Sequence, residues 1–239
     1  MTQHPEFWAE LHRRTQPFDL LCHPFYIAWT AGELTREDLR EYAAEYYHQV
    51  QAFPQYLLAL AVRLQNGELR RAVLDNFSDE MALTSAGEPP HHALWLQFAS
   101  GMGASASEIR TREPIAEVQE LTATFTKIAS TGSPAEALAA FYAYESQVPR
   151  VAEAKEAGLK QRYGADDNTC SYFHLHKTAD LLHSNVWREQ LDAVLDNEPE
   201  AAEKALNAAE TAAYSLWRAL DGIESGRQDR MNRRQAAAS

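Results

Sequence analysis

The chain has 239 residues, a formal net charge of -12 at pH 7 and two cysteines, Cys22 and Cys170. This acidic balance argues against a nucleic-acid partner, which would require a basic face. Two cysteines are too few for a disulfide framework, the N-terminal residues lack the apolar core of a signal peptide, and no apolar run could cross a membrane. We therefore expect a soluble, cytoplasmic globular protein without a membrane or nucleic-acid partner.

Almost every segment shows the apolar spacing of an amphipathic helix, and none alternates as a strand would. A capping box is expected at Thr35 and Asp38, and Pro54 is expected to bend or split its helix. The break at residues 84–90 contains Gly87 and two prolines. The expected helices lie at residues 4–14, 19–32, 34–65, 68–83, 91–103, 115–130, in two stretches within 133–164, around 171–187, and at 197–224.

This pattern predicts a single all-α bundle. No domain boundary or internal repeat marks residues 1–226, which we expect to form one helical metal-binding domain. Residues 227–239 are basic and poor in apolar side chains, so a disordered tail is expected there. Helical bundles build metal sites in their cores from side chains on facing helices.

A candidate metal site begins with three polar residues on one helix. His176, Asp180 and His183 are spaced i, i+4 and i+7, which places them on a single helical face. Imidazole and carboxylate ligands suit iron or manganese, and the lack of a cysteine among them argues against structural zinc. The alternative is a polar face with two incidental histidines. The choice depends on whether other segments supply partners.

Three further residues could complete such a site. Glu145 lies among apolar residues, where a carboxylate must be paired, protonated or bound to a cation. Glu80 lies near the end of its helix, although it could equally be an exposed charge beside Asp79, and His91 opens the helix after the prolines. Three histidines and three carboxylates would suit a dinuclear iron or manganese site with a bridging carboxylate and open positions for O2.

Four segments carry a resemblance to a known family. They are HPFYIAWTAGELTREDLREYAAEYYHQVQAFPQYL, HHALWLQFASGMG, AFYAYESQVPRVAEAKEAGL and HKTADLLH. Together they resemble the haem-oxygenase-like diiron oxidases, and most of all the CADD group, named for the chlamydial protein associating with death domains. The resemblance runs from about residue 5 to residue 225. It implies a seven-helix haem-oxygenase-like bundle without haem, and its relatives make a homodimer the expected assembly.

The resemblance also implies a ligand set and cofactors. It implies two metal ions, Fe/Fe or Fe/Mn, with O2 and an external reductant as co-substrates. Because the break at 84–90 is longer than the group would suggest, Glu88 and His92 are rivals for two of the positions, and His174 is a weaker rival for a third. The implied ligands are Glu80, His91, Glu145, His176, Asp180 and His183.

The resemblance further implies an activity, the synthesis of p-aminobenzoate for folate from the protein's own side chains. A tyrosine of the chain would supply the ring, and Tyr26 in HPFY matches it. A lysine would supply the amino group, and Lys155 in AEAKEAGL matches it. Read without the resemblance, Tyr26 could be core packing and Lys155 a solvated surface lysine. Pro149 leaves the helical phase between Lys155 and Glu145 open.

Other functions remain open at this point. A diiron oxidase of an external small molecule, such as a fatty acid or amino acid, would turn over repeatedly without losing Tyr26. A non-catalytic protein that binds a ligand or partner would need no metal. Thiaminase-like relatives use an activated cysteine, for which neither Cys22 nor Cys170 has the setting, and a pyrroloquinoline-quinone synthase would need a basic pocket where residues 170–187 offer only Lys177.

Overall fold

The structure is a computed structural model that describes residues 3–83 and 87–238. Within them the chain forms eleven α-helices and three short 3-10 turns, no β-strand, and no helix long and apolar enough to cross a membrane. The all-α prediction is confirmed. The helices are α1 (Pro5–Thr15), α2 (Pro24–Ala31), α3 (Arg36–Ala61), α4 (Glu68–Glu80), α5 (His91–Gly101), α6 (Ala106–Thr111), α7 (Ala116–Thr131), α8 (Pro134–Glu145), α9 (Val148–Arg162), α10 (Asp167–Asn197) and α11 (Ala202–Ala238).

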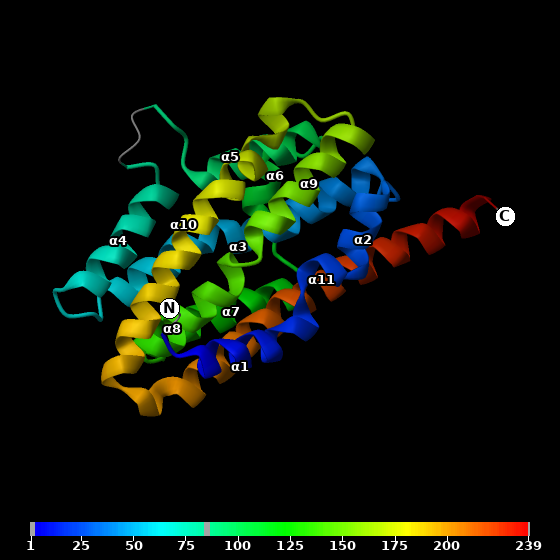
Figure 1. Ribbon diagram of the computed structural model, residues 1–239. Coiled ribbons are helices and arrows are strands. Elements are labelled where there is room, and N and C mark those ends of the chain that lie inside the picture. The colour runs from blue at the N-terminus through cyan, green and yellow to red at the C-terminus, as the bar shows by residue number, and fades with distance from the viewer. Residues whose placement is uncertain (1–2, 84–86, 239) are drawn as a thin grey trace.

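Three long helices organise the bundle (Figure 1). Helix α10 contacts α4, α5, α8 and α9, α3 packs against α4, α5 and α7, and α11 packs against α1, α7 and α8. The tryptophans Trp29, Trp95 and Trp187 are fully buried between them. Consequently, the helices that carry the predicted metal ligands (α4, α5 and α8) all meet the helix that carries the remaining three, α10.

Local sequence signals explain most helix ends. Thr35 Oγ1 accepts from the Asp38 N–H at 3.1 Å while Asp38 Oδ2 accepts from the Thr35 N–H at 2.9 Å, which is the predicted capping box. Pro54 does not split α3, contrary to one of the two expectations, because packing against α4, α5 and α7 holds the helix through it. Residues 84–86 of the predicted break lie outside the described chain.

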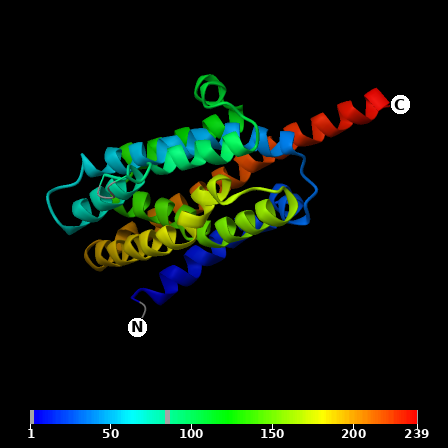
Figure 2. The ribbon, with the colours of Figure 1, turned by 90° about the horizontal axis from the view of Figure 1, so that it is seen from above.

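The C-terminal segment differs from its prediction. Residues 227–239 were expected to be disordered, but α11 continues through all but the last of them, which is not described, and projects beyond the bundle (Figure 2). Arg230 Nη2 lies 3.0 Å from Asp38 Oδ1, and Arg234 pairs with Glu37. Two of the basic residues in the segment predicted to be disordered, Arg230 and Arg234, therefore have acidic partners at the start of α3, which composition alone does not reveal.

We predict that Asp38 contributes more to stability than its neighbour Glu37. Asp38 is 1% exposed, closes the capping box and pairs with Arg230, so Asp38→Ala should lower the free energy of unfolding by about 1–3 kcal/mol. Glu37→Ala removes only an exposed ion pair and should cost less than about 0.5 kcal/mol. Urea unfolding of both variants measures the difference, and equal losses would contradict the assignment.

Candidate metal centre

Four helices bring the six predicted ligands to one buried place. Glu80 ends α4, His91 begins α5, Glu145 ends α8, and the other three lie on α10. None of the six is more than 7% exposed. Because water cannot solvate charges at this depth, the side chains must be satisfied by one another or by a cation.

The ligand atoms form two groups of three that share one residue. Glu80, His91 and His176 make the first group, and Glu80, Glu145 and His183 make the second. Within each group the ligand atoms lie within 4.8 Å of one another. Glu80 belongs to both groups, so its carboxylate would be the ligand that two metal ions share. Asp180 belongs to neither group, but its Oδ1 lies 3.4 Å from His183 Nδ1.

Hydrogen bonds fix which ring nitrogen of each α10 histidine faces the centre. His176 Nδ1 donates to the Tyr172 carbonyl at 2.7 Å, which leaves Nε2 free to bind a metal. His183 Nε2 lies 3.5 Å from Asp79 Oδ2, which leaves Nδ1 facing Glu145 at 3.6 Å. Such outer partners orient metal ligands in proteins generally.

Several inward-facing atoms are left without a hydrogen bond. They are His91 Nδ1, Glu145 Oε1 and His183 Nδ1, all buried. His91 Nδ1 nevertheless lies 3.0 Å from Glu80 Oε2. Imidazole nitrogens and carboxylate oxygens are therefore close together without a proton in position to join them by a hydrogen bond. Buried polar atoms are rarely left in this state. Two divalent cations would satisfy them, so the residues present fit a dinuclear iron or manganese centre.

The protonation of the metal-free ligands points the same way. Burial lowers the pKa of His176 to about 3, so its imidazole is neutral, the form that binds a metal. Burial raises the pKa of Asp180 to about 7. Burial alone would lower the pKa of His183, but Asp180 and Glu145 outweigh it and raise this pKa to about 11. The raised pKa places a positive charge on His183 beside Asp180 and Glu145, where a metal cation could take its place.

The rival ligands named from the sequence lie outside both groups. Glu88 is exposed and His92 is half-buried. The His174 side chain is 74% exposed, with its Nδ1 3.6 Å from Glu156 Oε1. The geometry therefore favours His91 over His92 and His176 over His174 as candidate ligands.

Tyr26 and Lys155 form a second buried cluster. Lys155 Nζ donates to Tyr26 Oη at 2.7 Å and to Tyr42 Oη at 2.5 Å, and the two hydroxyls lie 2.9 Å apart. Lys155 is only 5% exposed, so the reading of a solvated surface lysine is wrong. Burial holds the pKa of the Lys155 amine well below its usual value, which favours the uncharged amine.

Several residues that were not among the candidate site residues also contact these clusters. The ring of Tyr172 stacks on His176 at 3.9 Å, and the Trp187 indole donates to Glu145. Both continue the face of α10, because Tyr172 precedes His176 by four residues and Trp187 follows His183 by four. This spacing could have identified them. Tyr42, in contrast, lies on α3, and its contact with Lys155 depends on tertiary packing rather than on spacing along one helix.

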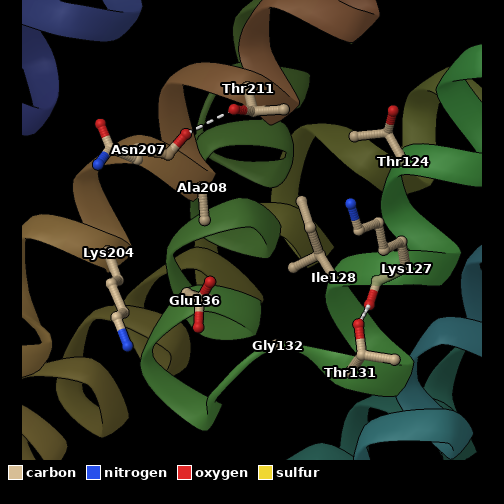
Figure 3. A pocket seen from close by; sticks show the side chains of 10 residues that line it. All are labelled: Thr124, Lys127, Ile128, Thr131, Gly132, Glu136, Lys204, Asn207, Ala208 and Thr211. Carbon is tan, nitrogen blue, oxygen red and sulfur yellow. Dashed lines mark hydrogen bonds between the residues drawn. The ribbon is translucent and has the colours of Figure 1, made fainter.

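Little space is left beside the Tyr26 and Lys155 cluster. The cavity there has a volume of about 20 Å³, and Tyr46, Tyr144 and Tyr172 also line it. This is room for about one water molecule, far below the few hundred Å³ of a typical small-molecule site. A larger hollow of about 510 Å³ lies between α7, α8 and α11, and contains none of the candidate ligands (Figure 3).

Comparison with known proteins gives matches over most of the chain. Residues 40–217 match the model of a family described as iron-containing redox enzymes. The 4-aminobenzoate synthase of Nitrosomonas europaea is 40% identical over 214 residues, 85% of each chain. The protein with the same name in Chlamydia trachomatis serovar D is 36% identical over 218 residues, 91% of each chain.

A solved structure shows the same fold. It is a domain of unknown function with a haem-oxygenase-like fold from Shewanella denitrificans, with a TM-score of 0.75 and 18% identity. The match covers 93% of this chain and 92% of that one. The haem-oxygenase-like bundle expected from the sequence is confirmed, with its helices divided more finely than the seven that the resemblance implies.

We predict that metal stoichiometry separates the two ligand groups. His176→Ala should abolish one metal position and His183→Ala the other, whereas Glu80→Ala should abolish both because Glu80 is shared. Anaerobic Fe(II) titration followed by elemental analysis measures the bound metal. Glu88→Ala and His174→Ala serve as controls and should keep the wild-type stoichiometry. Retention of both metals in Glu80→Ala would contradict the bridging assignment.

A second prediction concerns the buried amine. Between the lowered folded pKa of Lys155 and about 10.4, only the unfolded chain binds this proton, so stability should rise with pH by up to about 1.4 kcal/mol per unit. Lys155→Met should remove this contribution, whereas the exposed Lys127→Met should not. Urea unfolding from neutral pH to about 10 measures the slopes. Identical slopes in wild type and Lys155→Met would show that Lys155 is charged in the fold.

Proposed function

Because the chain belongs to the family of iron-containing redox enzymes, we propose that it makes 4-aminobenzoate from its own Tyr26 and Lys155, using O2 and an external reductant. The observation that carries this proposal is the buried contact of Lys155 Nζ with Tyr26 Oη at 2.7 Å, beside a cavity too small for an added substrate. Relatives up to 40% identical bear the name 4-aminobenzoate synthase, which supports it.

The product matches the atoms of these two side chains. A tyrosine ring already carries a carbon and an oxygen in para positions. To become 4-aminobenzoate, it must lose its Cα–Cβ bond, have Cβ oxidised to a carboxylate, and exchange its phenol oxygen for nitrogen. Lys155 Nζ lies 4.2 Å from the centre of the Tyr26 ring and donates a hydrogen bond to the phenol oxygen. The nitrogen is therefore already beside the ring carbon to which it must become attached.

The atoms and electrons of both steps balance. In the first step one O2 splits the bond between Cβ and Cα, both oxygen atoms join Cβ as a carboxyl group, and one Cβ hydrogen remains on Cα, leaving glycine at position 26. In the second step the phenol and the lysine amine react with one O2, two electrons and two protons. The products are the aryl amine, a lysine-derived aldehyde and two waters. The two electrons come from the external reductant.

The chain's own residues would prepare this chemistry. When bound, the metal pair, Fe/Fe or Fe/Mn, would supply oxidising power by activating O2. Glu80, His91, Glu145, His176, Asp180 and His183 would hold it. Tyr42 fixes the Lys155 amine against Tyr26 through its hydroxyl, and the surrounding aromatic side chains exclude bulk water from the ring. An uncharged amine keeps the lone pair that attachment to the ring requires.

Two other functions named from the sequence predict different behaviour. An oxidase of an external fatty acid or amino acid would turn over many times and leave Tyr26 intact. A non-catalytic binding protein would be indifferent to loss of His176. The homodimer and the cytoplasmic location also remain predictions, testable by light scattering and by fractionation of the native cell.

The decisive experiment adds O2 and reductant, without substrate, to anaerobic protein loaded with Fe(II), with or without Mn(II). We expect at most one 4-aminobenzoate per chain by mass spectrometry, with glycine replacing tyrosine in the Tyr26 peptide. Protein containing ¹⁵N-lysine should give labelled product. Metal binding without product would favour an external substrate, and absence of metal binding would favour a binding protein.

Matched variants identify the consumed side chains. Tyr26→Phe and Lys155→Met should each reduce the product by at least about a hundredfold, because each removes an atom of the exchange itself. Tyr56→Phe is the control, since Tyr56 is equally buried but its hydroxyl bonds to Gln49. Full product from Tyr26→Phe would overturn the assignment of this tyrosine.

A further inference from the structure

A surface hollow reaches both halves of the metal centre. It lies between α4, α5 and α10 and has a volume of about 320 Å³. His91 and His183 line it, one from each group of candidate ligands. The carboxylates of Asp79 and Glu88 lie on its exposed side, and Ala179 and Leu182 of α10 form part of its wall.

On the other sides of the centre, the described residues 3–83 and 87–238 place packed aromatic side chains. The Tyr172 ring stacks on the His176 ring, with 3.9 Å between the ring centres. Trp187 is fully buried and donates a hydrogen bond to Glu145. Toward Tyr26 only the cavity of about 20 Å³ remains, and aromatic side chains line it. A hydrated ion therefore has no comparable route from those directions.

We propose that this hollow is the port through which divalent metal ions enter the centre, and that Asp79 and Glu88 attract them. The proposal rests on the metal centre of the proposed function. Across residues 3–83 and 87–238, no lysine or arginine forms an ion pair with either carboxylate, and the ion pair that Asp79 makes is with the His183 ring at 3.5 Å. Six waters around the ion would fill roughly 180 Å³, which the hollow accommodates.

The hollow also offers a metal ion a short path to the candidate ligands inside the centre. Asp79 Oδ2 lies 3.5 Å from His183 Nε2, and on the other edge of this ring Nδ1 lies 3.4 Å from Asp180 and 3.6 Å from Glu145. A cation leaving Asp79 therefore has to pass only one imidazole ring to reach two carboxylates. His91 and His183 are more than nine-tenths buried, and each has an Nδ1 without a hydrogen bond to receive the ion.

The test measures the rate of metal uptake by the metal-free full chain. Anaerobic protein is mixed with Co(II) in a stopped-flow instrument, and ligand-field absorbance follows binding. The double variant Asp79→Asn, Glu88→Gln should take up Co(II) about tenfold more slowly at low ionic strength and respond less to added salt, because steering by charge is lost. Glu120→Gln, an exposed residue of α7, should bind at the wild-type rate.

A steric variant tests the route independently of charge. Ala179→Phe should slow both uptake and chelator-driven release by a similar factor, leaving affinity and final stoichiometry unchanged. Wild-type rates in both the double variant and Ala179→Phe would overturn the port while leaving the metal centre intact. If the wild-type chain binds no metal at equilibrium, the centre itself is wrong and the port falls with it.

Discussion

The dominant constraint in this molecule is the burial of six ionisable side chains, none of which is more than 7% exposed to water. Removing a carboxylate or an imidazolium from water costs several kcal/mol unless a partner compensates. Here the six converge from α4, α5, α8 and α10, and their inward atoms face one another without enough protons to pair them. The four helices thus enclose a group of side chains that metal cations would satisfy.

A second consequence is the separation of two kinds of chemistry. Helix α10 presents candidate metal ligands toward α4 and α5, and Tyr172 and Phe173 toward the cluster of Tyr26 and Lys155. The polar candidate ligands thus lie on one side and a nearly dry aromatic pocket on the other. The metal centre would lie close to the side chains that it oxidises, while bulk water is kept out of their pocket. Lys155 can stay uncharged only in such a pocket, because bulk water would restore its charge.

The sequence predicted those features that depend on spacing along one helix. His176, Asp180 and His183 were found because a face of α10 repeats every three to four residues, and the capping box at Thr35 because it is local. Features that depend on how helices pack against one another could not be predicted from the sequence. The sharing of Glu80 between two groups and the burial of Lys155 after Pro149 arise only from tertiary packing.

The depth of Tyr26 bears on the fate of a chain that has acted. Its ring is 2% exposed and contacts Phe25, Trp29 and Tyr42. Replacing it with glycine would leave a void that costs about 3–5 kcal/mol, a large part of the 5–15 kcal/mol that stabilises a typical domain. A spent chain would melt sooner than a fresh one, and cellular proteases would clear it first. The stability of each molecule would therefore show whether it has already acted.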